Sequence, residues 1–222
     1  EILIGLVGSE MCIRDRISLS VDNKYLHRRG RITTAKVTAN VQNSSNSKVT
    51  YSLSSTACAK INSTTGVITV KTESEIGSNI QLCEAGETVT VTGKLPSGKS
   101  ATVKVNIEKD LSARFYGSNS QYNDSYIGSS QIVKQGDTRQ FSIIANQDVS
   151  WDAKCEDATH SYYGACTYTG KTSSSTTSFA GTLGATYKRS DGTVTNLPSS
   201  IKVTFSTKAG QAIVLTIRQD IA

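Results

Sequence analysis

Residues Ala101–Glu108 alternate between apolar and polar side chains, and this pattern constrains the fold more than any other feature of the sequence. Ala101, Val103, Val105 and Ile107 share one face of the predicted strand, because successive side chains of a β-strand point to opposite sides. Polar and charged residues occupy the other face. One buried face and one face in water are typical of antiparallel sheets.

Similar short runs recur along the chain, separated by turns rich in Gly, Asn, Ser and Pro. No segment shows convincing helical periodicity. In the first half the predicted strands are Ile17–Val21, Ile32–Val41, Val49–Leu53, Ala59–Ile61, Val67–Lys71, Glu87–Leu95 and Ala101–Glu108. In the second half they are Ser112–Tyr116, Arg139–Ala145, Val149–Lys154, Ala165–Tyr168, Ser178–Leu183, Ala185–Lys188, Ile201–Ser206 and Ala212–Arg218. This spacing predicts an all-β chain of two tandem immunoglobulin-like antiparallel β-sandwiches.

A joint between the two sandwiches is predicted at Glu108–Leu111, where one alternating pattern ends before the next begins. The first domain then covers residues 17–108 and the second covers residues 109–222. The second domain is the candidate for binding, because its predicted loops are longer and richer in tyrosine.

The opening of the chain differs in composition from the rest. Residues 6–16, LVGSEMCIRDR, hold the only methionine and resemble the in-frame translation of a transposase-type sequencing adaptor. A signal peptide is not favoured, because Glu1 leads and the apolar run ILIGLVG is short. We therefore expect residues 1–16 to be non-native, the native sequence to begin near Ile17, and the chain to be the C-terminal piece of a longer protein.

Without residues 1–16 the chain has 22 basic and 15 acidic residues, a formal charge of +7. Because the lysines are scattered, this charge is interpreted as favouring solubility, although it also attracts acidic partners non-specifically. The one dense basic run is His27–Arg31. A solvated turn is the preferred interpretation of this run, and contact with phosphate or sulfate is the alternative.

Four cysteines follow the opening segment and fall as two local pairs, one in each half of the chain. They are Cys58, Cys83, Cys155 and Cys166. An even number arranged in this way predicts two disulfides within the domains, and hence a location outside a reducing cytoplasm. The alternative is four buried free thiols. Neither pair has the spacing of a zinc site.

The first domain resembles a known family along most of its length. The segments VTYSLSSTACAKINSTTGVITVKTESEIG, Val49–Gly77, and EAGETVTVTGKLPSGKSATVKVNIE, Glu84–Glu108, are similar to bacterial Ig-like domains of group 2. Tyr51 stands where that family usually has Trp, and the family does not require Cys58 or Cys83. The resemblance implies a sandwich fold and a non-catalytic module of bacterial surface proteins, adhesins or phage virion proteins. It supplies no catalytic residues.

The second domain resembles Bacteroidetes-associated Ig-like sandwich domains less closely. The similarity lies in the closing apolar strand, Ile213–Gln219, with Thr216 and Gln219 at its end. Trp151 has a position typical of an early strand, where a core role is favoured over a platform for sugars.

Enzyme chemistry has little support in the sequence. GKLPSGKS, Gly93–Ser100, matches the phosphate-binding pattern G-x-x-x-x-G-K-[ST], but an alternating strand follows it where a helix is required. A hairpin tip is therefore predicted. The chain has only two histidines, His27 and His160, and no G-x-S-x-G motif. No catalytic residue, metal or cofactor is predicted.

Tyrosine supplies the best functional signal, since six of the nine tyrosines lie between residues 116 and 168. Tyr122, Tyr126, Tyr162 and Tyr163 are interpreted as lying in polar loops, of which Gly117–Ser130 is the longest. Tyrosine gives large, rigid contact area, and the neighbouring Ser and Asn adapt their hydrogen bonds. We predict that these four residues bind a ligand; packing inside the domain is the alternative.

Together these features predict a non-catalytic extracellular or cell-surface adhesion module that binds a glycan or protein through its terminal sandwich. One alternative is a phage virion structural protein, in a head decoration or tail fibre, whose partners are other virion subunits. A second alternative is a set of accessory domains of a larger carbohydrate-active enzyme. No specific nucleic-acid partner and no membrane span within this sequence are expected.

Overall fold

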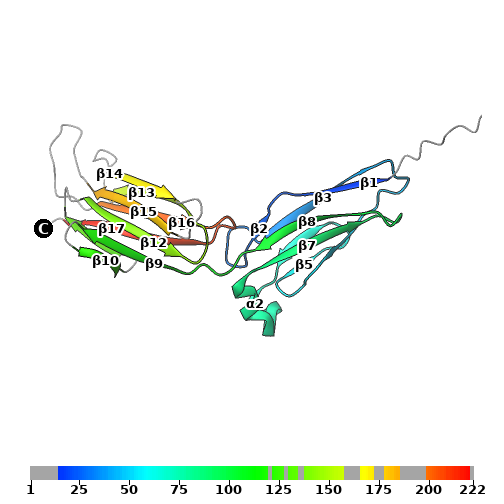
Figure 1. Cartoon of the computed structure of the whole chain (residues 1–222), viewed down its shortest axis with the longest axis horizontal. Coiled ribbons are helices and arrows are strands. Elements are labelled where there is room, and N and C mark those ends of the chain that lie inside the picture. Colours follow the sequence, from blue (N-terminus) through cyan, green and yellow to red (C-terminus); the bar gives the residue numbers. More distant parts are fainter. Residues whose placement is uncertain are drawn as a thin grey trace, which may run out of the picture. The chain divides into compact units, whose positions relative to one another are not determined.

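The structure is a computed structural model, and it describes residues 15–119, 122–127, 130–134, 138–157, 166–172, 178–185 and 199–220. The chain divides into two compact units, each built mainly of β-strands (Figure 1). The first unit consists of Glu1–Leu26, Thr34–Cys83 and Glu87–Ile107. The second consists of His27–Thr33, Glu84–Gly86 and Glu108–Ala222.

The first unit contains two four-stranded sheets with the strand orders β1-β3-β6-β5 and β2-β8-β7-β4. The strand bounds are β1 Arg16–Val21, β2 Tyr25–Leu26, β3 Thr34–Gln42, β4 Thr50–Leu53, β5 Ala59–Ile61, β6 Val67–Val70, β7 Glu87–Lys94 and β8 Ser100–Ile107. All pairs are antiparallel except β2 with β8. In immunoglobulin nomenclature these sheets have the A-B-E-D and A′-G-F-C orders, which confirms the predicted fold.

The core of the first unit forms where the inward faces of its two sheets meet. Val37 and Ile68 come from one sheet, and Val89, Val91 and Val105 come from the other; each has 0% exposed surface. These positions are the inward members of the period-two patterns, so burial follows the alternation. The predicted strands of this half all form, with end points shifted by no more than a few residues.

The motif at Gly93–Ser100 is a hairpin tip, as predicted. β7 ends at Lys94 and β8 begins at Ser100, and the Leu95 N–H donates to the Lys99 carbonyl at 2.8 Å. Gly98 has φ +88°, a turn conformation that favours glycine. No helix follows the loop, so it cannot hold a phosphate on a helix N-terminus.

One segment forms helical turns that the alternation of the sequence did not predict. A helical segment joins β6 to β7 and consists of α1 (Glu73–Ile76), a 3₁₀ turn (Gly77–Asn79) and α2 (Ile80–Ala85). At its start the Thr72 N–H donates to the Glu75 carboxylate at 2.9 Å. The T-x-x-E pattern is the sequence signal that could have found this helix. An ion pair with Lys60, together with bonds from Thr72, lowers the pKa of Glu75 to about 2.

Gly66 closes the turn before β6 against β3 and β4. Its φ is +71°, and a Cβ atom there would lie 2.7 Å from the Val37 carbonyl oxygen and 3.1 Å from the Tyr51 ring. The backbone conformation and the close approach both favour glycine at this position. This is the glycine of the Gly66–Val67 motif that the resemblance to group 2 bacterial Ig-like domains includes.

We expect Gly66→Ala to lower the free energy of unfolding of the first unit by about 2 kcal/mol, because strained φ alone costs about 1–3 kcal/mol. Thermal unfolding followed by circular dichroism measures the effect. Gly98→Ala is the control for positive φ in open space, since no atom lies within 4 Å of its Cβ position. An equal loss in both variants would show that the close approach at Gly66 contributes nothing.

The second unit has the same strand order with one strand added. Its sheets are β10-β9-β12-β15-β14 and β11-β17-β16-β13, and β11 runs parallel to β17. The strand bounds are β9 Ala113–Asn119, β10 Tyr122–Ile127, β11 Ser130–Lys134, β12 Thr138–Ala145, β13 Ser150–Asp157, β14 Cys166–Thr172, β15 Ser178–Ala185, β16 Ser199–Ser206 and β17 Ala212–Asp220. This is a second immunoglobulin-like sandwich, as predicted.

The core of the second unit includes Ile143, Val203, Phe205 and Leu215, all at most 2% exposed. The Phe115 and Phe205 rings pack at a centroid distance of 5.7 Å. Trp151 lies partly buried against this cluster. Its position favours the core role over the sugar platform.

Candidate functional site

The structure places the four predicted ligand-binding tyrosines differently from one another. Tyr122 and Tyr126 lie in β10, whereas Tyr162 and Tyr163 fall outside the described residues. The prediction of a long loop at Gly117–Ser130 was wrong, because β9 continues to Asn119 and β10 follows at Tyr122. The sequence reading failed here because Gly, Ser and Asn interrupt the apolar alternation that marks strands elsewhere.

β10 is the outermost strand of its five-stranded sheet, next to β9. Tyr126 pairs with Tyr116, and Tyr122 pairs with Asn119 across a register shift between Tyr122 and Ser125. Edge strands carry main-chain donors and acceptors that no neighbouring strand uses. Tyr122 and Tyr126 therefore stand on an edge strand, a position compatible with ligand contact.

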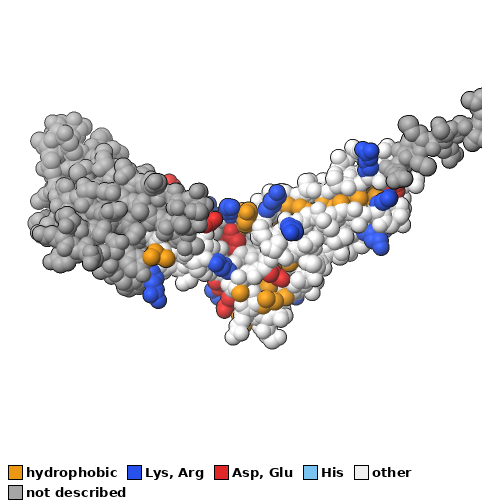
Figure 2. Space-filling view, in the orientation of Figure 1, with side chains coloured by type: hydrophobic (Ala, Val, Ile, Leu, Met, Phe, Trp, Pro, Cys, Tyr) orange, Lys and Arg blue, Asp and Glu red, His pale blue; other side chains and the backbone are white. Residues whose placement is uncertain are grey.

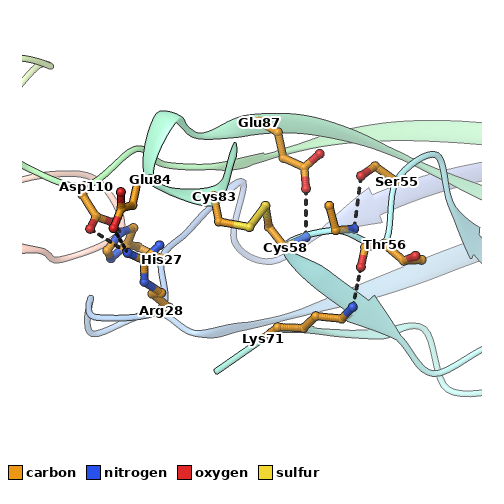
Figure 3. Close-up of a disulfide and its surroundings, with 11 residues drawn as sticks. His27, Arg28, Ser55, Thr56, Cys58, Lys71, Cys83, Glu84, Glu87 and Asp110 are labelled. Carbon is orange, nitrogen blue, oxygen red and sulfur yellow. Dashed lines mark hydrogen bonds and ion pairs between the residues drawn. A yellow bond between two sulfur atoms is a disulfide. The ribbon is translucent and has the colours of Figure 1, made fainter. Parts of the chain in front are cut away.

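A disulfide joins Cys58 and Cys83 in the first unit, with Cα atoms 5.4 Å apart. Cys58 has 0% and Cys83 has 2% exposed surface. The Cys58 N–H donates to the Glu87 carboxylate at 3.2 Å, and nearby the Lys71 ammonium donates to the Thr56 carbonyl at 2.6 Å (Figure 3). The first predicted cysteine pair is thus present. Cys155 lies in β13 and Cys166 in β14, and their pairing stays a prediction.

The interpretation of His27–Arg31 as a solvated turn was wrong for its first two residues. His27 is 1% exposed, and the Arg28 side chain is 4% exposed. The Arg28 guanidinium donates to Asp110 Oδ2 at 2.7 Å, and its Nη2 lies 3.7 Å from Glu84 Oε1 (Figure 3). The exposed Arg29 side chain also reaches Asp110, at 3.2 Å. His27, Arg28 and Arg29 therefore all contact Asp110 within the second unit, whereas Arg31 is exposed.

Asp110 is held by a second set of hydrogen bonds. Its N–H donates to the Glu84 carbonyl at 3.0 Å, and its carbonyl accepts from the Asn146 amide at 2.8 Å. The two residues before Asp110 are held by Gln211, whose side-chain amide donates to the Glu108 carboxylate at 3.2 Å and to the Lys109 carbonyl at 2.9 Å. Nothing in the sequence signals this cluster, because its members lie on distant segments.

The two hydrogen bonds of His27 determine its protonation. Nδ1 accepts the Arg29 N–H at 3.0 Å, so Nε2 carries the proton and donates to Asp110 Oδ1 at 2.8 Å. A proton added at Nδ1 would face the Arg29 N–H and eliminate that bond. Burial lowers the pKa of His27 below 6.5, and the hydrogen bond with Asp110 opposes this shift without cancelling it. The ring is therefore a structural donor and acceptor, held neutral.

We expect the stability of the second unit to decrease as the pH falls below 6.5. There the unfolded chain binds a proton at His27 that the folded chain resists, so the free energy of unfolding decreases by at most about 1.4 kcal/mol per pH unit. Urea unfolding at pH 7.5 and 5.5 measures this. His27→Gln is expected to flatten the dependence, and His160→Gln, the other histidine, is the control. A His27→Gln variant as pH-sensitive as the native chain would contradict the assignment.

Among the described residues, no group of three or more His, Cys, Asp or Glu residues is arranged to hold a metal ion. Within the same part of the chain, no helix is long and apolar enough to cross a membrane. On the face shown in Figure 2, the lysines and arginines of the first unit are spread out instead of gathered into one patch.

Comparisons with known proteins find resemblance in structure only. No family model matches the sequence, and no curated protein matches it. A protocadherin gamma B7 fragment with four extracellular cadherin domains is similar at 15% identity and a TM-score of 0.30, covering 93% of this chain and 50% of that chain. An I-band fragment of titin is similar at 11% identity and a TM-score of 0.36, covering 91% and 65%. A fragment of human protocadherin-24 is similar at 11% identity and a TM-score of 0.31, and the match covers 92% of this chain and 97% of that chain.

The chain spans about half the length of the protocadherin gamma B7 and gamma B3 fragments that it matches. At such TM-scores these neighbours carry no argument about ligand or activity. The immunoglobulin-like architecture rests on the strand orders of the two units.

Proposed function

We propose that the chain is a non-catalytic extracellular module in which the second sandwich binds a cell-surface glycan or protein and the first acts as a spacer. The observation that carries the proposal is the position of Tyr122 and Tyr126 on the edge strand β10. Tyrosine on an edge strand supplies a large apolar ring together with a hydroxyl that can donate and accept. Tyr162 and Tyr163 are included in the proposed surface from the sequence.

The first unit supports the spacer role through its construction. Its resemblance to group 2 bacterial Ig-like domains covers residues 17–108, and its strand order is that of an immunoglobulin sandwich. A buried disulfide within it is typical of proteins outside a reducing cytoplasm.

The non-catalytic role agrees with the position of His27 in the second unit. Both ring nitrogens of His27 form hydrogen bonds, with Asp110 and with the Arg29 N–H, so this residue is not available as a catalytic base. The virion and accessory-domain alternatives stay predictions, since no described residue favours either.

The test is a glycan array and a whole-cell binding assay with the full 222-residue chain. Alanine variants of Tyr122, Tyr126, Tyr162 and Tyr163 are each expected to weaken binding by about tenfold or more, the effect of an interface hot spot. Phenylalanine variants keep the rings and separate ring contact from hydroxyl contact. Periodate and protease treatment of the cells distinguish a glycan ligand from a protein ligand.

Lys94→Ala, at the exposed hairpin tip of the first unit, is the matched control and should bind like the native chain. If every tyrosine variant binds as well as Lys94→Ala, the tyrosine surface is not the binding site. Absence of saturable binding to any glycan or cell would contradict the adhesion role itself.

A further inference from the structure

The chain enters and leaves the first unit at opposite ends of its strands. β1 opens the unit and β8 closes it, and the start of β1 lies at the far end of the unit from the end of β8 (Figure 1). Ile107, the last residue of β8, pairs with Leu26 of β2. Ser100, the first residue of β8, lines a surface pocket together with Arg16 at the start of β1. Tension on the chain at both sides of this unit therefore acts along its strands.

Three ladders hold the strands through which such tension passes. β8 has a neighbour on each side, because it pairs with β7 over eight residues and with β2 at Tyr25 and Leu26. The Asn106 N–H donates to the Lys24 carbonyl at 2.8 Å, just before β2 begins. β1 pairs with β3 over six residues. Both the entry strand and the exit strand are thus secured along their length.

The direction of the load decides how these ladders resist it. The bonds of an antiparallel ladder lie perpendicular to the strands. A pull along the strands therefore loads all the bonds of a ladder together, whereas a pull across them at one end opens the bonds one after another. β2 and β8 are parallel, so pulling β2 from its start and β8 from its end slides them in opposite directions. Sliding also displaces the fully buried side chains of Leu26 and Val105.

We propose that the first unit is a load-bearing element, which carries tension between β1 and β8 in shear across these ladders. A spacer between a surface and a bound ligand is under tension whenever the two are drawn apart, so the inference rests on the spacer role proposed for this unit. It does not depend on the tyrosine surface or on the identity of the ligand, and its test needs no ligand.

The Cys58–Cys83 disulfide limits how far the unit extends once the ladders break. The two residues are 25 apart in sequence, and their Cα atoms are 5.4 Å apart. The segment between them contains β5, β6 and α1, and tension bypasses this segment while the disulfide is intact. At about 3.4 Å per extended residue, the disulfide withholds about 80 Å of extension.

The test is single-molecule force spectroscopy on the full 222-residue chain, pulled in two directions. An azide-bearing amino acid replaces Ser97, an exposed residue of the turn between β7 and β8. In one arrangement the handles are attached at the two ends of the chain, which loads the first unit along its strands. In the other they are attached at the N-terminus and at the azide. That turn and the start of β1 lie at the same end of the unit, so the second pull acts across the strands.

We expect the first unit to resist a force at least twofold higher along its strands than across them. The same protein is used in both arrangements, so its free energy of unfolding is the same and only the direction of loading differs. Forced unfolding depends on the unfolding rate, which the direction of loading changes. Equal forces in the two arrangements, or a lower force along the strands, would overturn the proposal.

The disulfide identifies the unfolding event of the first unit when both units are loaded. In the double variant Cys58→Ala with Cys83→Ala, this event should lengthen by about 80 Å. A reductant added to the native chain while it is held unfolded should release a step of the same length, and this measurement decides if the double variant does not fold. If the extension does not increase, the disulfide does not limit it and that part of the proposal is wrong.

Discussion

Replacing Asp110 with alanine is expected to lower the free energy of unfolding of the second unit by about 3 kcal/mol, the range for removing one partner of a buried ion pair. Arg28, whose side chain is 4% exposed, would lose its 2.7 Å contact with the Asp110 carboxylate, and the Glu84 carboxylate lies farther away, at 3.7 Å. The Nε2–H of the buried His27 would lose its acceptor. The loss of these two bonds reduces the compensation for the water that both groups give up on folding.

The single tryptophan, Trp151, lies in the second unit and reports its unfolding by fluorescence. Asp110→Asn keeps an oxygen acceptor for His27 but removes the charge, so its loss should be smaller than that of Asp110→Ala. Asp152→Ala removes an exposed carboxylate of the same unit and serves as the control. An Asp110→Ala variant as stable as Asp152→Ala would show that the cluster contributes nothing to folding.

Removing the Cys58–Cys83 disulfide is expected to lower the free energy of unfolding of the first unit by about 3.5 kcal/mol. The two residues are 25 apart in sequence, and chain-entropy arguments relate the stabilisation to the length of the closed loop. The double variant Cys58→Ala with Cys83→Ala avoids leaving a lone thiol in the core. Differential scanning calorimetry measures the shift.

Cys12 lies outside the described residues and outside the predicted native sequence. The variant Cys12→Ala is therefore the control for the loss of a cysteine. A double variant that unfolds at the same temperature as Cys12→Ala would refute the stabilising role. Titration of free thiols under denaturing conditions tests the second predicted pair. With Cys58 and Cys83 joined, one free thiol indicates that Cys155 and Cys166 are paired, and three indicate that they are free.

The helical segment at Glu73–Ala85 and the strand β10 are two elements that the hydrophobic pattern of the sequence did not predict. α1 and α2 are each too short for a hydrophobic period to be visible in the sequence. Its start signal, T-x-x-E at Thr72, was present in the sequence. β10 consists of YNDSYI, whose polar residues hide the alternation. In both cases the surrounding structure stabilises an element that its own sequence favours weakly.

The candidate site was only partly accessible from the sequence. Composition and spacing selected the four tyrosines, and Tyr122 and Tyr126 share one edge strand. The point at which β3 stops pairing with β6 could not be predicted, because it depends on where β6 begins relative to β3. β6 begins at Val67, directly after Gly66, whose backbone approaches Val37 and Tyr51 closely.

The sequence by itself determined the two sandwiches and the inward face of most strands. Alternation is a local property, and burying one face of each strand leaves few ways to pair them. Only the tertiary structure decided that His27 and Asp110, which are 83 residues apart in sequence, form a hydrogen bond of 2.8 Å. Local sequence cannot specify such a pair. A basic run is expected to be exposed to solvent, and its burial becomes favourable only when another segment supplies a carboxylate to pair with it.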